Sequence, residues 1–248
     1  MVTALIVTFS FFMILFIIAQ IIHNNSIVDI GWGIGFVISS WIVYFVNGAY
    51  SMSSIIVLAL VSLWGVRLFY HIAKRNIGKP EDFRYLNWRK AWGKWVVPRA
   101  FLQVFMLQAT LQFLIGLPIF YFLEKGLEFA VYSYIGVGLF LLGYFFQVVG
   151  DYQLKVHINK KSGTLLKTGL WSITRHPNYF GESLMWVSMY LVVLLSGGPW
   201  YLVISPLVIT SVLRFISIPL LEENMKKREG WDEYTKKVAI FYPFGLKQ

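Results

Sequence analysis

Long apolar stretches alternate with short polar segments along almost the whole chain. Seven of them approach the length of about 20 residues that crosses a bilayer as a helix. The first lacks a basic start and a small-residue cleavage site, so we expect a retained helix rather than a signal peptide. The pattern predicts an all-α polytopic membrane helix bundle of about seven transmembrane helices, in a single transmembrane domain over residues 1–248. The stretches are residues 2–22, 30–45, 53–72, 96–123, 132–150, 180–196 and 200–221.

Basic residues lie almost entirely on one side of this arrangement. Most of the 22 Lys and Arg fall in the predicted loops at about 73–95 and 151–179 and in the tail at 222–248. The opposite loops contain only Lys125. By the positive-inside rule the basic face is cytoplasmic, which places the N-terminus outside and the C-terminus in the cytoplasm. We expect a multi-pass integral membrane protein in contact with membrane lipids, in the plasma membrane or, in a bacterium, the inner membrane.

Composition narrows the function classes. Hydrophobic residues make up 57% and charged residues 14% of the chain, against about a quarter charged in soluble domains. The net charge of +10 follows from the basic loops, so we expect no nucleic-acid partner. The chain has no cysteine, which excludes disulfides and thiol catalysis. Its four histidines are not spaced as a zinc set, and we expect no metal site.

Several glycines lie within the apolar stretches. Gly31, Gly33 and Gly35 follow no predicted strand, so a nucleotide-binding glycine loop is rejected. Close packing between helices is the interpretation we favour for them. The same interpretation is given to three glycines of the fifth stretch: Gly136, Gly138 and Gly143.

Five ionisable residues lie inside the apolar stretches or at their basic ends: Asp29, Arg67, Asp151, Glu182 and Arg214. Such groups are costly in hydrocarbon, and they usually face one another or a wet cavity. One interpretation is internal ion pairing that fixes helix register. The other is a polar ligand drawn into the cytoplasmic half, which we favour because all five lie near the basic face.

The segment 174–182, TRHPNYFGE, has the features of an anion site. Pro177 suits the first turn of a helix, so the amides after it would be unpaired donors that attract phosphate. Arg175 could add a charge-assisted contact. Asn178 and Glu182 are four residues apart and share a helix face. This arrangement favours a large anionic cofactor over a simple ion.

Several stretches resemble one family, the DUF1295 group of membrane proteins related to steroid 5-alpha-reductases. The resemblance covers nearly the whole chain, and its most specific pieces are RNIGKPEDFRY and RHPNYFGE. Part of it, the RHPNY motif and the pair Glu222-Glu223, is also similar to isoprenylcysteine carboxyl methyltransferases. The matching stretches are residues 28–36, 64–85, 150–154, 162–182 and 213–244.

The resemblance implies a seven-helix bundle that holds NADPH at its cytosolic side, beneath a chamber for a lipid-soluble substrate. It implies an acidic side chain at Asp29 that faces the substrate carbonyl. The family's substrate-facing tyrosine falls near Trp64, so Tyr70 or Tyr85 would replace it, and the candidate catalytic residues are Asp29, Tyr70 and Tyr85. The expected cofactor-binding residues are Arg67, Asp151, Arg175, His176, Asn178, Tyr179, Glu182 and Arg214.

The leading hypothesis is an NADPH-dependent oxidoreductase that reduces an activated C=C bond in a steroid-like or isoprenoid-like lipid. Asp29 would be the acid at the substrate carbonyl or the group that orients it. The first alternative is an S-adenosylmethionine-dependent lipid or isoprenylcysteine-type methyltransferase. The second is a non-catalytic lipid-binding or transport protein, although the chain has no inverted repeat of the kind transporters use. The oligomeric state stays open.

Overall fold

The computed structural model describes residues 1–48, 50–160, 163–243 and 245. Parts of the predicted basic loop 151–179 and tail 222–248 therefore lie outside the described residues. Within the described part the chain is helical, with one isolated β-bridge between Thr174 and Ala239 and no named strand. The predicted all-α class is confirmed.

Seven helical stretches are long and apolar enough to cross a membrane, so the predicted number of spans is confirmed for the described residues. The C-terminal end of the fifth span lies beyond the predicted end at residue 150, because the helix continues to Asn159. The fourth includes the aromatic segment before it, which the sequence placed in a loop. The stretches are Val2–Ile21, Ile27–Asn47, Met52–Asn76, Phe83–Lys125, Ser133–Asn159, Pro177–Leu195 and Trp200–Met225.

The chain divides into two compact units, which we describe separately. The first comprises Met1–Phe129 with Ser196–Gly198, and the second Ala130–Leu195 with Pro199–Gln248. The single domain expected over residues 1–248 stays a prediction.

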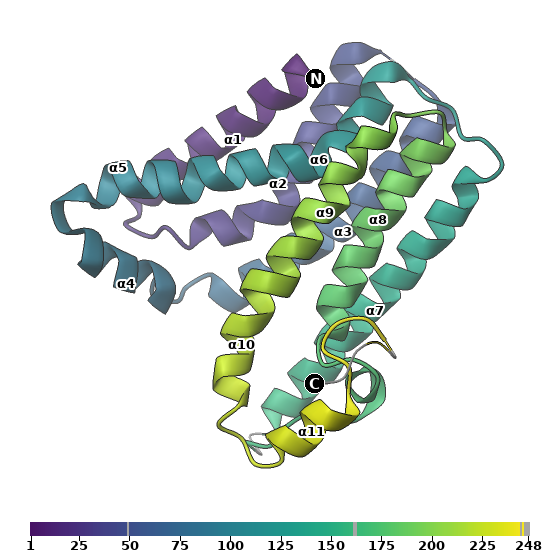
Figure 1. Cartoon of the computed structure of the whole chain (residues 1–248). Helices are drawn as coiled ribbons and strands as arrows, with labels where there is room; N and C mark the ends of the chain where they lie inside the picture. Colours follow the sequence, from purple (N-terminus) through teal and green to yellow (C-terminus); the bar gives the residue numbers. More distant parts are fainter. Residues whose placement is uncertain (49, 161–162, 244, 246–248) are drawn as a thin grey trace. The chain divides into compact units, whose positions relative to one another are not determined.

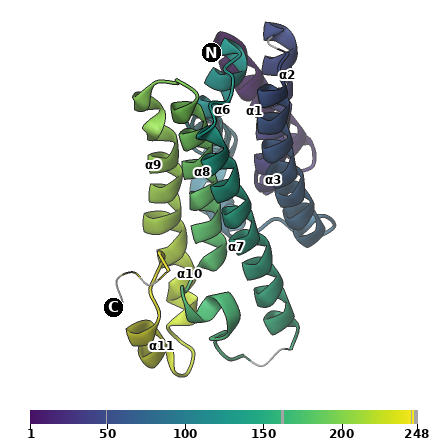
Figure 2. The ribbon, with the colours of Figure 1, turned by 90° about the vertical axis from the view of Figure 1, so that its right-hand side faces the viewer.

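In the first unit, α2 packs against α1, α3 and α6 (Figure 2). Its core includes Phe12, Tyr85 and Phe105, contributed by α1, α4 and the π-helical turn η2. Asp82 caps α4 by accepting a hydrogen bond from the Arg84 amide at 3.0 Å, which satisfies a donor at the helix start. The elements are α1 (Val2–Ile21), α2 (Ile27–Asn47), α3 (Met52–Asn76), α4 (Phe83–Trp92), η1 (Gly93–Trp95), α5 (Val96–Ala100), η2 (Phe101–Met106) and α6 (Leu107–Lys125).

Helices α2 and α3 meet at a pair of glycines. A β-carbon added at Gly33 would lie 2.5 Å from the carbonyl oxygen of Gly65, and one added at Gly65 would lie 2.6 Å from the carbonyl oxygen of Gly33. Gly31 and Gly35 instead approach the side chains of Leu15 and Gln112. The packing interpretation of these three glycines is confirmed.

In the second unit, α7 and α8 lie side by side (Figures 1 and 2). α8 begins at Pro177, as the sequence predicts. The π-helical turn η5 interrupts the last span, and α11 follows it. The elements are α7 (Ser133–Asn159), η3 (Gly169–Ser172), α8 (Pro177–Leu195), η4 (Trp200–Val203), α9 (Ile204–Ser211), η5 (Val212–Ser217), α10 (Ile218–Met225) and α11 (Trp231–Lys237).

Glycines again set the contact between α7 and α8. A β-carbon at Gly143 would lie 2.7 Å from the Gly181 carbonyl oxygen, and one at Gly136 would lie 3.0 Å from the Ser188 carbonyl oxygen. Gly138 has no such neighbour within 4 Å. The packing interpretation is therefore confirmed for Gly136 and Gly143 and wrong for Gly138, because Gly138 does not face another helix closely.

Candidate functional sites

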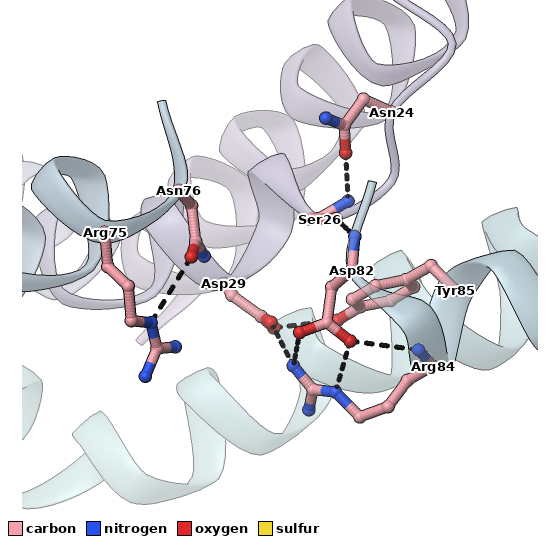
Figure 3. Close-up of polar contacts among 8 residues, drawn as sticks. All are labelled: Asn24, Ser26, Asp29, Arg75, Asn76, Asp82, Arg84 and Tyr85. Carbon is pink, nitrogen blue, oxygen red and sulfur yellow. Dashed lines mark hydrogen bonds and ion pairs between the residues drawn. The ribbon is translucent and has the colours of Figure 1, made fainter. Parts of the chain in front are cut away.

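In the first unit, a carboxylate, a phenol and a guanidinium meet at the start of α2 and α4 (Figure 3). Tyr85 donates a hydrogen bond to Asp29 Oδ1 at 2.7 Å. Arg84 Nη2 donates to Asp29 Oδ2, also at 2.7 Å. Tyr85 is buried, whereas the Arg84 side chain is 44% exposed. Asp29 therefore accepts hydrogen bonds at both oxygens, and it orients the Tyr85 hydroxyl and the Arg84 guanidinium.

Asp82 extends this cluster. Arg84 Nε donates to Asp82 Oδ1 at 2.9 Å, and the Asp82 amide donates to the Ser26 hydroxyl at 2.7 Å. Burial alone would raise the pKa of Asp82, but the hydrogen bonds and charge of Arg84 hold that pKa below its ordinary value. Asp82 is therefore ionised at neutral pH, and Arg84 bridges two carboxylates.

A second ion pair fixes the segment that carries the cluster. Glu81 is buried and faces Arg89, with Nε donating to Oε2 at 2.9 Å and Nη2 to Oε1 at 3.0 Å. The amide of Asn25 donates to Glu81 Oε1 at 2.6 Å. The ion pair, with its two hydrogen bonds, joins Glu81 to α4. The Asn25 contact ties the same segment to the turn between α1 and α2, and together these contacts position Asp82, Arg84 and Tyr85.

The other expected site residues of the first unit lie on α3. Tyr70 is 63% exposed, and its hydroxyl accepts a hydrogen bond from Lys74 at 3.5 Å. Arg67 is half-buried. Of the two phenols that the sequence proposes, the structure brings Tyr85 to Asp29.

In the second unit, the RHPNY segment builds a buried charged cluster with α10. Arg175 Nε lies 2.9 Å from Glu222 Oε1, and His176 Nε2 lies 3.0 Å from the same oxygen. All three residues are buried. The Arg175 guanidinium also lies over the ring of Trp231, 5.5 Å from its centroid, a distance at which the cation attracts the ring face.

The C-terminal segment holds Arg175 in place. The Arg175 amide donates to the Ala239 carbonyl at 2.8 Å, and the Thr174 hydroxyl donates to the Phe241 carbonyl at 2.8 Å. Tyr234 of α11 donates to the Trp171 carbonyl at 2.7 Å. Arg175 and the residues just before it are thus fixed by partners more than 60 residues later.

The Arg175 guanidinium is incompletely satisfied. Its side chain is fully buried, and within the described part of the chain neither Nη1 nor Nη2 makes a hydrogen bond. The charge is met by Glu222 and by the Trp231 ring, but the donors Nη1 and Nη2 have no acceptor among these residues. Buried donors of a charged group are rarely left without an acceptor, so this guanidinium suits an anionic ligand.

Three further expected cofactor residues of the second unit, Asp151, Asn178 and Glu182, make polar contacts between α7 and α8. Asn178 donates to Asp151 Oδ1 at 3.0 Å, and Gln147 donates to Glu182 Oε2 at 3.2 Å. The Tyr179 ring stacks on the His176 ring, with centroids 6.0 Å apart. One further residue, Arg214, lies in η5, and π-helical turns are frequent at functional sites.

His176 gives this cluster a pH dependence. Burial lowers its pKa, and the cations Arg175 and Arg214 lower it further, although Glu222 acts in the opposite direction. The folded protein therefore holds this imidazole neutral, while the unfolded chain takes up a proton below its ordinary pKa of 6.5. Protons bind preferentially to the unfolded state, so acid destabilises the fold.

We expect the thermal midpoint of the detergent-solubilised protein to fall as the pH is lowered from above 6.5 towards 5. The His176→Asn variant keeps a polar side chain without a titrating ring, and its midpoint should fall less over the same range. Equal slopes for the two proteins would show that His176 does not cause the dependence.

Sequence reasoning missed three charged residues that complete these sites: Glu81, Arg84 and Arg89. The signal was present, because the segment 81–95 mixes acids, bases and aromatics in a way that is unusual for a solvated loop. No spacing rule indicates that Arg84 reaches Asp29, 55 residues earlier. Among the described residues, no group of three or more acidic or histidine side chains is arranged to hold a metal ion.

Comparison with known proteins gives two matches. The family described as "Protein of unknown function (DUF1295)" matches residues 15–238, which confirms the expected family. An uncharacterized protein of Schizosaccharomyces pombe is 27% identical over 197 residues, covering 68% of this chain. The chain spans 57% of that relative's length. No solved structure matches the chain significantly.

Proposed function

This chain belongs to the DUF1295 family. Because its motifs also resemble those of steroid 5-alpha-reductases, we propose that it is an integral-membrane NADPH-dependent reductase. Its substrate would be a lipid-soluble molecule with an activated C=C bond. The observation that carries the proposal is Arg175 at the start of α8, a buried guanidinium whose Nη1 and Nη2 have no hydrogen-bond acceptor among the described residues.

This arrangement fits the anionic part of a dinucleotide. The start of a long helix attracts phosphate through its unpaired amides and its dipole. Arg175 would add charge-assisted hydrogen bonds from Nη1 and Nη2. A cofactor with several phosphate groups uses such a site more fully than S-adenosylmethionine, which carries a sulfonium and a carboxylate.

Neighbouring residues would orient the rest of the cofactor. Asn178 and Asp151 already form an amide–carboxylate pair, which suits the hydroxyl groups of a ribose. Tyr179 and His176 present a ring stack next to Arg175. When bound, NADPH supplies the hydride, and the protein supplies its position.

In the first unit, Tyr85 would hydrogen-bond the substrate carbonyl, on which negative charge develops as hydride reaches the β-carbon. Its O–H is directed by Asp29. When the phenol proton turns to a carbonyl oxygen, Asp29 keeps Arg84 as its partner, so its charge stays compensated. Asp29 then orients the donor, and Tyr85 is the donor itself.

The test is thermal stabilisation of the purified full chain in detergent. We expect NADPH at millimolar concentration to raise the midpoint, because a ligand that binds only the folded state stabilises it by about 2.7 kcal/mol at a concentration 100 times Kd. Arg175→Lys and Asn178→Ala should each lose most of this shift. Lys236→Gln, which removes an exposed charge from α11, should keep it.

A second ligand separates the competing enzyme class. Stabilisation by S-adenosylhomocysteine without stabilisation by NADPH would replace the reductase by the methyltransferase. A protein that responds to neither ligand would favour the non-catalytic lipid-binding alternative.

We also propose that the basic face is cytoplasmic, with the N-terminus outside. The absence of cysteine from the chain allows single cysteines to be introduced at Lys94 and at Leu127 and labelled from one side. Labelling of position 94 from outside intact cells would reverse this orientation.

A further inference from the structure

The first unit contains a cavity of about 430 Å³ at the ends of α1 and α3 and the start of α2. The segment 77–82, between α3 and α4, forms one of its sides. The cavity takes part in none of the steps proposed for Tyr85 and Asp29. We call this cavity the Lys79 cavity, after one of the cations that line it.

The walls of the Lys79 cavity are of two kinds. Ile22, Ile27 and Phe83 belong to its apolar part, and Arg75, Asn76 and Lys79 to its polar part. Ile22 is 52% and Phe83 68% exposed, so the apolar wall continues onto the outer surface of the unit. A ligand that fits both parts is amphipathic, with a polar head and an apolar chain.

The cations of the cavity form no close ion pair within the described residues. Neither Arg75 nor Lys79 forms an ion pair with a residue that the structure describes, and both are exposed. Arg75 Nε donates to Asn76 Oδ1 at 3.3 Å, the contact that Figure 3 shows. The Nδ2 atom of Asn76 is buried and has no acceptor within the described residues. The polar end thus offers two positive charges and an amide donor.

The acidic residue of the lining makes its direct contacts with Arg84 and not with these cations. Asp82 is engaged by Arg84 through its side chain and by the Arg84 amide (Figure 3). Arg84 in turn also binds Asp29. Two carboxylates and one guanidinium leave this cluster one formal negative charge, and the charge of Arg75 acts on Asp82. Arg75 and Lys79 together outweigh that charge, so the polar end of the cavity stays positive.

We propose that the Lys79 cavity binds an anionic phospholipid, with its phosphate held by Arg75, Lys79 and the Asn76 amide. Charged nitrogen donors bind phosphate through short, charge-assisted hydrogen bonds, and basic pockets between membrane helices are typical sites for acidic head groups. The first carbons of the glycerol and acyl chains lie against Ile22, Ile27 and Phe83. The apolar wall favours a lipid over a free phosphate compound.

The experiment uses the full chain in nanodiscs of dioleoylphosphatidylcholine to which dioleoylphosphatidylglycerol is added in increasing fraction. We expect the anionic lipid to raise the thermal midpoint at low fraction. The double variant Arg75→Gln/Lys79→Gln should need at least about tenfold more of it, because it loses both charged donors to the phosphate. The matched control, Lys90→Gln/Lys94→Gln, removes two exposed charges outside the cavity and should respond like the wild type.

Each other outcome overturns the proposal. Equal losses in the two double variants would mean general attraction of the basic surface to the membrane. Stabilisation of the wild type by sn-glycerol 3-phosphate as strongly as by the lipid would assign the site to a soluble phosphate compound. If the Arg75→Gln/Lys79→Gln variant lost its response to NADPH and kept its response to the lipid, the cavity would belong to the nucleotide. Midpoints without added ligand show whether each variant folds, and this proposal does not rest on the reductase activity.

Discussion

Tyr85→Phe is expected to lower kcat for enone reduction by about 100- to 1,000-fold, the loss that follows removal of one donor to a developing oxyanion. The phenyl ring keeps the packing of the buried side chain, and only the O–H that Asp29 directs is removed. The measurement follows NADPH consumption with two probe substrates, the 3-oxosteroid progesterone and the unsaturated aldehyde farnesal.

The comparison variant is Tyr70→Phe. Tyr70 is exposed and its hydroxyl contacts Lys74, so this variant should retain most of the activity. Stabilisation by NADPH should be unchanged in Tyr85→Phe, because the cofactor contacts we propose lie in the second unit. A large loss in Tyr70→Phe with full activity in Tyr85→Phe would assign the donor to the other phenol.

Gly181→Ala is expected to destabilise the second unit by about 3 kcal/mol or more, the upper range for inserting a methyl group into a packed interface. The added β-carbon would lie 2.4 Å from the Gly143 carbonyl oxygen and 2.6 Å from the Gln147 amide nitrogen. Both atoms belong to the backbone of α7, so no side-chain rotation relieves the clash. Thermal unfolding in detergent, or loss of the folded fraction on size-exclusion chromatography, measures the effect.

Gly138→Ala is the matched control. It adds the same methyl group to α7, but at a position with no neighbour within 4 Å. We expect it to be neutral or slightly stabilising, because alanine is the better helix former. Similar destabilisation by the two variants would show that α7 and α8 do not approach as closely as the structure has them.

The glycines also show what the sequence could and could not predict. The apolar stretches and their lengths were sufficient to place all seven spans, since the bilayer sets the length of a helix that crosses it. The small residues indicated close helix contacts. Their spacing could not distinguish Gly138 from Gly143, because both lie on α7 and only the rotation of that helix decides which one faces α8.

The polar sites likewise have features that the sequence predicts and features that it does not. The start of α8 at Pro177 and the location of Arg175 followed from local rules of helix initiation. The partners of Arg175 did not, because Glu222 and Trp231 lie about 50 residues away in sequence and reach it through tertiary packing. Asp29 was identified as a charge in an apolar stretch, but its pairing with Arg84 and Tyr85 is a tertiary contact between segments about 55 residues apart.

The bridge between Thr174 and Ala239 has a consequence for biosynthesis. Translation proceeds from the N-terminus, so the segment around Arg175 is made and inserted well before residues 231–241 leave the ribosome. During that interval the backbone partners of Thr174 and Arg175 do not yet exist. The buried cluster around Arg175 is therefore completed only after residues 231–241 have been made, and a nascent chain that stops before α11 is left with an unassembled Arg175.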